Sequence, residues 1–370
     1  MKHLRLSALT ALTLMFAGGT QILAPSAVAQ QCPATLGASD AAIRAQAMQA
    51  DTYRPAHRFA DGAGVTVAVI DTGVEPHPRL LLHEDNEAGD CQAHGTIVAG
   101  IIGARDQGDG VVGVAPGARI LGIRQHNEGQ DQQDDTTGSL STLVDAIQRA
   151  IDHKVDVINI SLAACVPADA ELDLTPLEQV LARAEAEGVV VVAAAGNAGG
   201  TCDAQAKVLP AAMPTVLGVG ALVNPRQLAD YSMPALGEKL SAPGHVAAAL
   251  NPRGPGLVGG LDQHHNVEAF EGTSFAAPVV SGTVALLRQR YPEATPGEIR
   301  ELLWNSVDPN TGTIHPDTAI SFQHTAATHR EAHIQADRPH GSPARGHLLW
   351  VLLGSGAILL SCVIFGPRRG

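Results

Sequence analysis

Apolar runs and amphipathic stretches alternate through the first part of the chain. Residues 65–70, VTVAVI, form an uninterrupted apolar run rich in β-branched side chains, which is typical of a strand buried on both faces. The elements predicted after it are a helix at 94–104, a strand at 119–122, a helix at 141–153, a strand at 155–162, a helix at 176–187 and a strand at 189–195. This alternation predicts an α/β fold: a doubly wound, mostly parallel sheet with right-handed crossovers and helices on both faces.

The first 29 residues have the pattern of a secretory signal peptide. A basic start precedes an apolar stretch at 6–16, and Ala27 and Ala29 give the small-x-small form of a cleavage site. Residues 30–60 are then an N-terminal extension of the mature chain, and we expect a short helix at 40–50 within it.

The other end of the chain has the pattern of a membrane anchor. Residues 348–365 carry no charge, and about 18 apolar residues are near the minimum that spans a bilayer. A buried core helix is the alternative. The stretch follows a polar linker at 308–347, whose histidines we interpret as solvated, and precedes two arginines that favour a cytoplasmic tail at 366–370. We therefore predict a single-pass protein of the cell membrane, with an extracytoplasmic domain at 61–307.

The overall charge excludes one class of partner. The formal net charge is -13 at pH 7, whereas proteins that bind nucleic acid present basic surfaces. Dinucleotide binding is also excluded, because Gly62 and Gly64 precede the first strand and a dinucleotide-binding glycine motif must follow it.

Four of the five cysteines are available for disulfides in an exported chain, since Cys362 lies in the predicted span. Zinc binding is the alternative, but no CxxC spacing accompanies them. Cys165 and Cys202 each follow the end of a predicted parallel strand, which favours a bond between them and a second bond between Cys32 and Cys91. The other pairings remain open.

Three residue types needed for nucleophilic catalysis lie at the ends of predicted elements. Asp71 follows the first strand, His94 opens a helix, and Ser274 opens another helix. A hydroxyl attacks poorly at neutral pH until a neighbouring base accepts its proton, and a carboxylate behind an imidazole fixes the tautomer of that base. The alternative is that Thr273 and Ser274 only cap a core helix.

The motifs around these residues resemble those of the subtilisin-like serine proteases, and the similarity covers most of residues 60–307. The order Asp, His, Ser is also that of subtilisin. The matching blocks are DTG at 71–73, HGT at 94–96, AAAGN at 193–197 and GTSFAAP at 272–278.

The resemblance implies a role for each matching residue. Asp71 would orient His94, His94 would act as general base and then acid, and Ser274 would attack the peptide carbonyl. The side-chain amide of Asn197 would donate a hydrogen bond to the oxyanion, together with the backbone N–H of Ser274.

The resemblance also places substrate contacts at two segments. The residues expected to line the pocket or pair with substrate backbone are Ser161, Leu162, Ala194 and Gly196. Ala163 stands where the family usually has glycine, so we expect a preference for small residues at the cleavage position. We expect no cofactor and no metal, and we interpret Asp106 and Asp109 as solvated turn residues rather than calcium ligands.

The order of modules resembles the mycosins, the membrane-anchored subtilases associated with type VII secretion systems. This resemblance implies an extracytoplasmic endopeptidase that acts on proteins or peptides exported by, or belonging to, such a system, with its membrane components as partners. A protein that chiefly stabilises the secretion complex, with proteolysis secondary, is the alternative.

Overall fold

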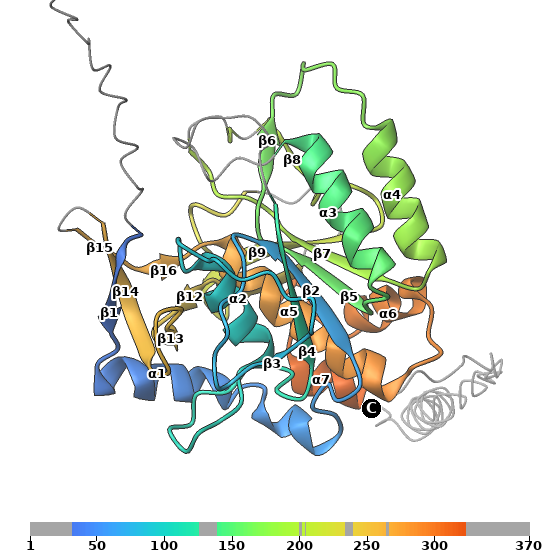
Figure 1. Cartoon of the computed structure of the whole chain (residues 1–370). Helices are drawn as coiled ribbons and strands as arrows, with labels where there is room; N and C mark the ends of the chain where they lie inside the picture. The colour runs from blue at the N-terminus through green and yellow to red at the C-terminus, as the bar shows by residue number, and fades with distance from the viewer. Residues whose placement is uncertain are drawn as a thin grey trace, which may run out of the picture. The chain divides into compact units, whose positions relative to one another are not determined.

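The computed structural model describes residues 32–125, 139–199, 202–203, 205–233, 240–263 and 266–322 (Figure 1). The predicted signal peptide, most of the predicted linker and the predicted membrane span lie outside these residues. Within the described part of the chain, no helix is both long and apolar enough to cross a membrane.

A mostly parallel sheet forms the centre of the described domain, as predicted. Its strands lie in the order β10-β9-β7-β5-β2-β4-β3, with β11 also paired to β9, and only the β10–β9 pair is antiparallel. The bounds are β2 Thr66–Asp71, β3 Leu81–Leu82, β4 Arg119–Arg124, β5 Val157–Ile160, β7 Val190–Ala194, β9 Val216–Asn224, β10 Gln227–Leu228 and β11 Leu240–Pro243.

Helices cover both faces of this sheet because successive strand residues point to opposite sides. In β2, Val67 and Val69 pack into one apolar cluster, while Ala68 and Ile70 pack into the other. The first cluster includes residues of α2 and α5, and the second includes residues of α3 and α4 (Figure 1). The helices are α2 His94–Gly103, α3 Leu140–Asp152, α4 Thr175–Ala186, α5 Thr273–Arg290, α6 Pro296–Trp304 and α7 Pro316–Ser321.

The N-terminal extension is part of the folded domain. Strand β1 (Ala34–Gly37) pairs antiparallel with β14 (Leu257–Gln263), which also pairs with β13 (Ala249–Leu250) and β15 (Asn266–Glu268).

A helix follows β1 at the predicted position, Asp40–Ala50 (α1), and leads into the short 3-10 helix η1, Arg54–Arg58. Tyr53 is almost fully buried between the two helices and donates a hydrogen bond from its hydroxyl to the Val112 carbonyl (2.7 Å). The extension therefore contributes to the same core as the sheet.

The folded domain also extends past its predicted C-terminal boundary. Ala319 and Ile320 in α7 are fully buried, and the Ile314 N–H donates to the Ser241 carbonyl (2.9 Å). The boundary expected at residue 307 is therefore too early, because the polar composition of this stretch concealed a short buried helix. The domain continues through Phe322.

Both disulfides favoured by the sequence are present: Cys32 bonds to Cys91, and Cys165 bonds to Cys202. The second joins strand β6 to the chain just before β8. The remaining short strands form two antiparallel pairs, β6 (Ala164–Val166) with β8 (Lys207–Leu209), and β12 (His245–Val246) with β16 (Phe270–Glu271).

Candidate active site

Asp71 and His94 are in direct contact at the carboxyl edge of the sheet. Asp71 is the last residue of β2 and is fully buried, and His94 is the first residue of α2. The Nδ1 atom of His94 lies 2.7 Å from Oδ1 of Asp71. An ionised carboxylate only accepts hydrogen bonds, so Nδ1 carries the proton and the neutral ring keeps Nε2 as its acceptor. This is the tautomer that a general base requires.

The surroundings of His94 favour its charged form. Burial lowers the pKa of His94, but the negative charge of Asp71 and the hydrogen bond to it outweigh burial, so that this pKa is raised above the ordinary histidine value. Asp90 and Glu268 add to the rise by their charges. About a quarter of the His94 side chain remains exposed, which leaves the ring accessible from outside.

A second buried carboxylate, Asp90, lies behind this pair. It accepts a hydrogen bond from the Thr72 hydroxyl (2.7 Å) and one from the Thr96 N–H (2.8 Å), and the same Thr72 hydroxyl accepts one from the Gly95 N–H (3.0 Å). Burial raises the pKa of Asp90, and these hydrogen bonds partly oppose the rise. Asp90 was not predicted as a site residue, and its one local signal in the sequence is that it lies four residues before His94.

Gly95 permits the close approach between β2 and α2. A Cβ at this position would lie 2.1 Å from the carbonyl oxygen of Gly73, so any larger residue would push the two segments apart. The HGT motif therefore has a steric reason in addition to its chemical one.

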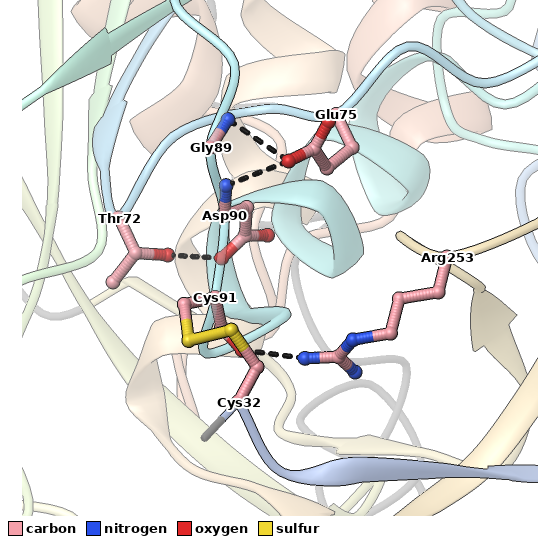
Figure 2. The surroundings of a disulfide bond; sticks show 7 residues. All are labelled: Cys32, Thr72, Glu75, Gly89, Asp90, Cys91 and Arg253. Carbon is pink, nitrogen blue, oxygen red and sulfur yellow. Dashed lines mark hydrogen bonds between the residues drawn. A yellow bond between two sulfur atoms is a disulfide. The ribbon is translucent and has the colours of Figure 1, made fainter. Parts of the chain in front are cut away.

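The chain that leads into α2 is fixed from several directions (Figure 2). Cys91 is bonded to Cys32 of the extension, and its carbonyl accepts a hydrogen bond from Arg253 (2.7 Å). The Glu75 carboxylate accepts the backbone N–H groups of residues 89–90 at 2.9 and 3.0 Å. A covalent bond and charged side chains thus determine the path of this segment.

Ser274 is the second residue of α5, and the start of this helix meets the start of α2. The ring of Phe275 lies against His94, with centroids 5.2 Å apart, and against Phe270 at 6.2 Å. This ring contact was not anticipated from the sequence, and it brings the Ser274 segment beside His94.

Asn197 lies beside the same helix start with its amide orientation defined. Its Oδ1 accepts hydrogen bonds from the Thr273 N–H (3.0 Å) and the Thr273 hydroxyl (3.1 Å). The Nδ2 group is therefore the part of this exposed side chain that is left to donate. A Cβ on Gly272 would lie 3.0 Å from Nδ2, so the glycine keeps space open beside it.

A chain of hydrogen bonds between uncharged, buried side chains leads to the backbone carbonyl of Ser274. The Ser161 hydroxyl donates to the Ser274 carbonyl (2.9 Å), the Asn159 amide donates to Ser161 (2.9 Å), and the Ser281 hydroxyl donates to the Asn159 carbonyl oxygen (2.8 Å). All three supporting side chains are buried. The Ser161 side chain thus faces inward, so that only the backbone of this residue can contact a substrate.

The other residues expected to contact substrate lie along the two segments flanking this site. Ala194 ends β7 and is buried, and the Gly196 N–H donates to the Thr273 hydroxyl (3.1 Å). Gly196 has a positive φ of 91°, which favours glycine there. Leu162, just after β5, is the member of the expected set whose side chain is only partly buried. Ala163 packs on the small apolar cluster that includes Val208 and Met233.

The two aspartates of the 106–110 loop have different surroundings. Asp109 pairs with the buried Arg79, whose hydrogen bond holds the Asp109 pKa below its usual range. Asp106 accepts the N–H groups of Gly108 (2.8 Å) and Gly110 (3.1 Å). Asp106 is thus an exposed turn residue, as expected, whereas the expectation is corrected for Asp109, whose carboxylate pairs with a buried arginine.

Fold and site together define a subtilisin-like α/β protein in which a histidine, hydrogen-bonded to a buried aspartate, lies beside a helix whose second residue is serine. Residues 62–328 match the model of the Subtilase family, Peptidase S8, and the chain belongs to this family.

Its relatives include the mycosins. The chain is 39% identical over 284 residues to Mycosin-1 of Mycobacterium tuberculosis, and the alignment covers 66% of this chain and 64% of that protein. The chain thus spans slightly less than two thirds of this relative's length.

Two solved structures extend the similarity. One is MycP1 from the ESX-1 type VII secretion system, with a TM-score of 0.68, 34% identity, and coverage of 74% of this chain and 85% of that chain. The other is a chain of an intact ESX-5 inner membrane complex, with a TM-score of 0.70, 27% identity, and coverage of 90% and 93%.

Proposed function

We propose that this protein is a serine endopeptidase in which Asp71, His94 and Ser274 form the catalytic triad. The observation that carries the proposal is the 2.7 Å hydrogen bond between His94 Nδ1 and the buried Asp71, because it leaves Nε2 as the base. The ring contact of Phe275 with His94 puts the Ser274 segment next to that base.

The reaction proceeds in two half-reactions. The Ser274 hydroxyl attacks the carbonyl carbon of the scissile peptide while His94 Nε2 takes its proton, and Asp71 stabilises the imidazolium. The Asn197 Nδ2 and the backbone N–H of Ser274 donate to the oxyanion. His94 then gives the proton to the leaving amine, the C–N bond breaks, and an acyl-enzyme forms. Water activated by His94 hydrolyses the ester and restores Ser274.

The substrates in this proposal are proteins or peptides that carry a small residue at the cleavage position. Ala163 supports this preference, because it adds a methyl group to a segment expected to flank the bound peptide. This segment packs on Val208 and is held by the disulfide between Cys165 and Cys202. Leu162 and the backbone of residues 194–196 would line the bound peptide.

The cellular setting belongs to the same proposal. The similar solved chains come from an ESX-1 system and from an ESX-5 inner membrane complex, which supports a partner among type VII secretion membrane components. Residues 1–29 would be a signal peptide and residues 348–365 a single membrane span, so that the peptidase domain is extracytoplasmic.

A second candidate function is stabilisation of a secretion complex, with proteolysis secondary. It is favoured by the similarity over 90% of this chain to a chain of an assembled ESX-5 complex.

The two candidates separate in one pair of assays with Ser274→Ala. The first incubates the purified full chain with a peptide library and sequences the new N-termini of the products. We expect cleavage after small residues by the wild type and none by the variant. The second measures secretion in cells that carry the variant. Full secretion without cleavage supports the stabilising role, and loss of secretion shows that secretion requires proteolysis. A folded wild type that cleaves no library peptide contradicts the enzymatic proposal.

A further inference from the structure

Two histidines and an aspartate converge at the side of the domain away from the proposed triad. His83 follows β3, Asp85 lies two residues later, and His153 is the C-cap of α3. The Nδ1 atoms of His83 and His153 lie 3.6 and 3.4 Å from the same carboxylate oxygen of Asp85. The two imidazole rings meet nearly edge to face, with centroids 5.7 Å apart.

The spacing of these atoms suits a metal ion. In a tetrahedral zinc site with bonds of 2.0–2.2 Å, neighbouring ligand atoms are about 3.3 Å apart. The two nitrogen-to-oxygen distances are close to that value, and one ligand atom from each of the three residues lies within 4.8 Å of the others. Within the described part of the chain, this is the one group of three or more His, Cys, Asp or Glu side chains with such spacing.

We propose that His83, Asp85 and His153 bind a zinc ion, with water as the fourth ligand. Imidazole and carboxylate together suit Zn²⁺. The site is open to solvent, since the three side chains are 17%, 54% and 36% exposed. The carboxyl end of α3 adds a negative dipole end beside His153, which favours a bound cation.

The tautomer of His83 fits this role. Its Nδ1 accepts a hydrogen bond of 3.2 Å from the backbone N–H of Asp85, so Nδ1 carries a lone pair rather than a proton. Zinc would replace that N–H as the partner of Nδ1. The N–H belongs to an exposed residue and can bond to water instead.

The ion would join two elements rather than take part in hydrolysis. The His83 N–H bonds to the carbonyl of Ile120 near the start of β4, whereas Asp71 pairs with Arg124 at the end of that strand. The segment after β3 is otherwise joined to α3 through the contact of Arg149 with Glu87. Zinc would add a second link between the segment and the helix. His153 is far from the other two residues in the sequence, which is why no local motif indicated the site.

The test measures thermal unfolding of the full chain as Zn²⁺ is added, in wild type, Asp85→Asn and His153→Gln. At a hundredfold excess of zinc over its Kd, we expect the wild-type Tm to rise by about 5 °C. Both variants should lose that rise, and Co²⁺ should give tetrahedral absorption bands in the wild type but not in these two variants.

His245→Gln is the matched control. His245 faces Glu271 at 3.4 Å, the same spacing as His153 and Asp85, but without a third ligand among the described residues. This variant should keep the full response to zinc. The histidines other than His153 and His245 are common to all variants, so their effect cancels in the comparison.

Two results would overturn the proposal. One is an equal zinc response in wild type, Asp85→Asn and His153→Gln, which would place binding elsewhere. The other is an absent response in the wild type. The His153 cap is made by its backbone N–H, so His153→Gln retains it and should fold even if Asp85→Asn does not.

Discussion

The two sides of the candidate active site are built with different interactions. The start of α2, which carries His94, is fixed by the bond between Cys32 and Cys91 and by the buried carboxylates Asp71 and Asp90. The start of α5, which carries Ser274, is supported by neutral hydrogen bonds through buried side chains such as Asn159. The position and charge of His94 should therefore depend on pH and redox conditions, while the position of Ser274 at the start of α5 should depend on neither.

The largest effect is expected on the charged side, from Asp71→Asn. The asparagine amide favours the wrong tautomer of His94, so kcat should fall by about 10⁴-fold with little change in KM. Steady-state kinetics on a cleaved library peptide measures both constants. A loss below tenfold would mean that Asp71 does not orient the base.

A smaller loss is expected on the neutral side, from Asn197→Ala. Removal of the Nδ2 donor should reduce kcat by about 10²- to 10³-fold. The pH at which activity is half maximal should stay unchanged, because no charge is altered. An unchanged kcat would assign the oxyanion to other donors.

The disulfide of the charged side offers a test of stability. Replacing Cys32 and Cys91 by serine should lower the free energy of unfolding by about 2–4 kcal/mol and should also reduce kcat/KM. The comparison variant replaces Cys165 and Cys202, which join β6 to the chain before β8. It should lose similar stability, measured by denaturant unfolding, without altering the pH profile. Equal catalytic pH profiles and rates in both double variants would remove the distinction between the two sides.

The smallest effects concern the pH profile. His94 must be neutral to accept a proton, so activity is lost as pH falls through its pKa, which is raised above the ordinary histidine value. Asp90→Asn removes a negative charge near His94 and should therefore lower the His94 pKa. The acidic limb of the pH profile, where activity is lost on acidification, should then move to lower pH. The substitution should also reduce kcat/KM by about 3- to 10-fold through the lost Thr96 contact.

Glu268→Gln is the control for that variant. Glu268 is exposed, so its substitution should move the acidic limb slightly in the same direction without a loss of rate, and added salt should abolish the shift. A limb that moves to higher pH in either variant would contradict the electrostatic account.

The sequence predicted those parts of the fold that have a local signal. The buried strand at β2, the amphipathic α3 and the short helix α1 were all expected near their observed positions. The strand ends correctly located Asp71, and the succession of strands favoured the observed bond between Cys165 and Cys202.

Contacts between distant segments could not be predicted in this way. The pairing of β1 with β14 depends on backbone groups that any sequence offers, and Asn159 is hidden within an apolar run although it supports Ser161. The position of Asp90 behind Thr72 likewise depends on how the loop folds. Tertiary packing, rather than periodicity, determines each of these.

The most direct test of the central claim is the mass-spectrometric mapping of a fluorophosphonate adduct on the purified, folded chain. We expect one adduct on Ser274, forming rapidly in the wild type and about 10⁴-fold more slowly in Asp71→Asn. No adduct on Ser274 in the folded wild type, or an equal rate in the variant, would contradict the assignment of Asp71, His94 and Ser274 as a catalytic triad.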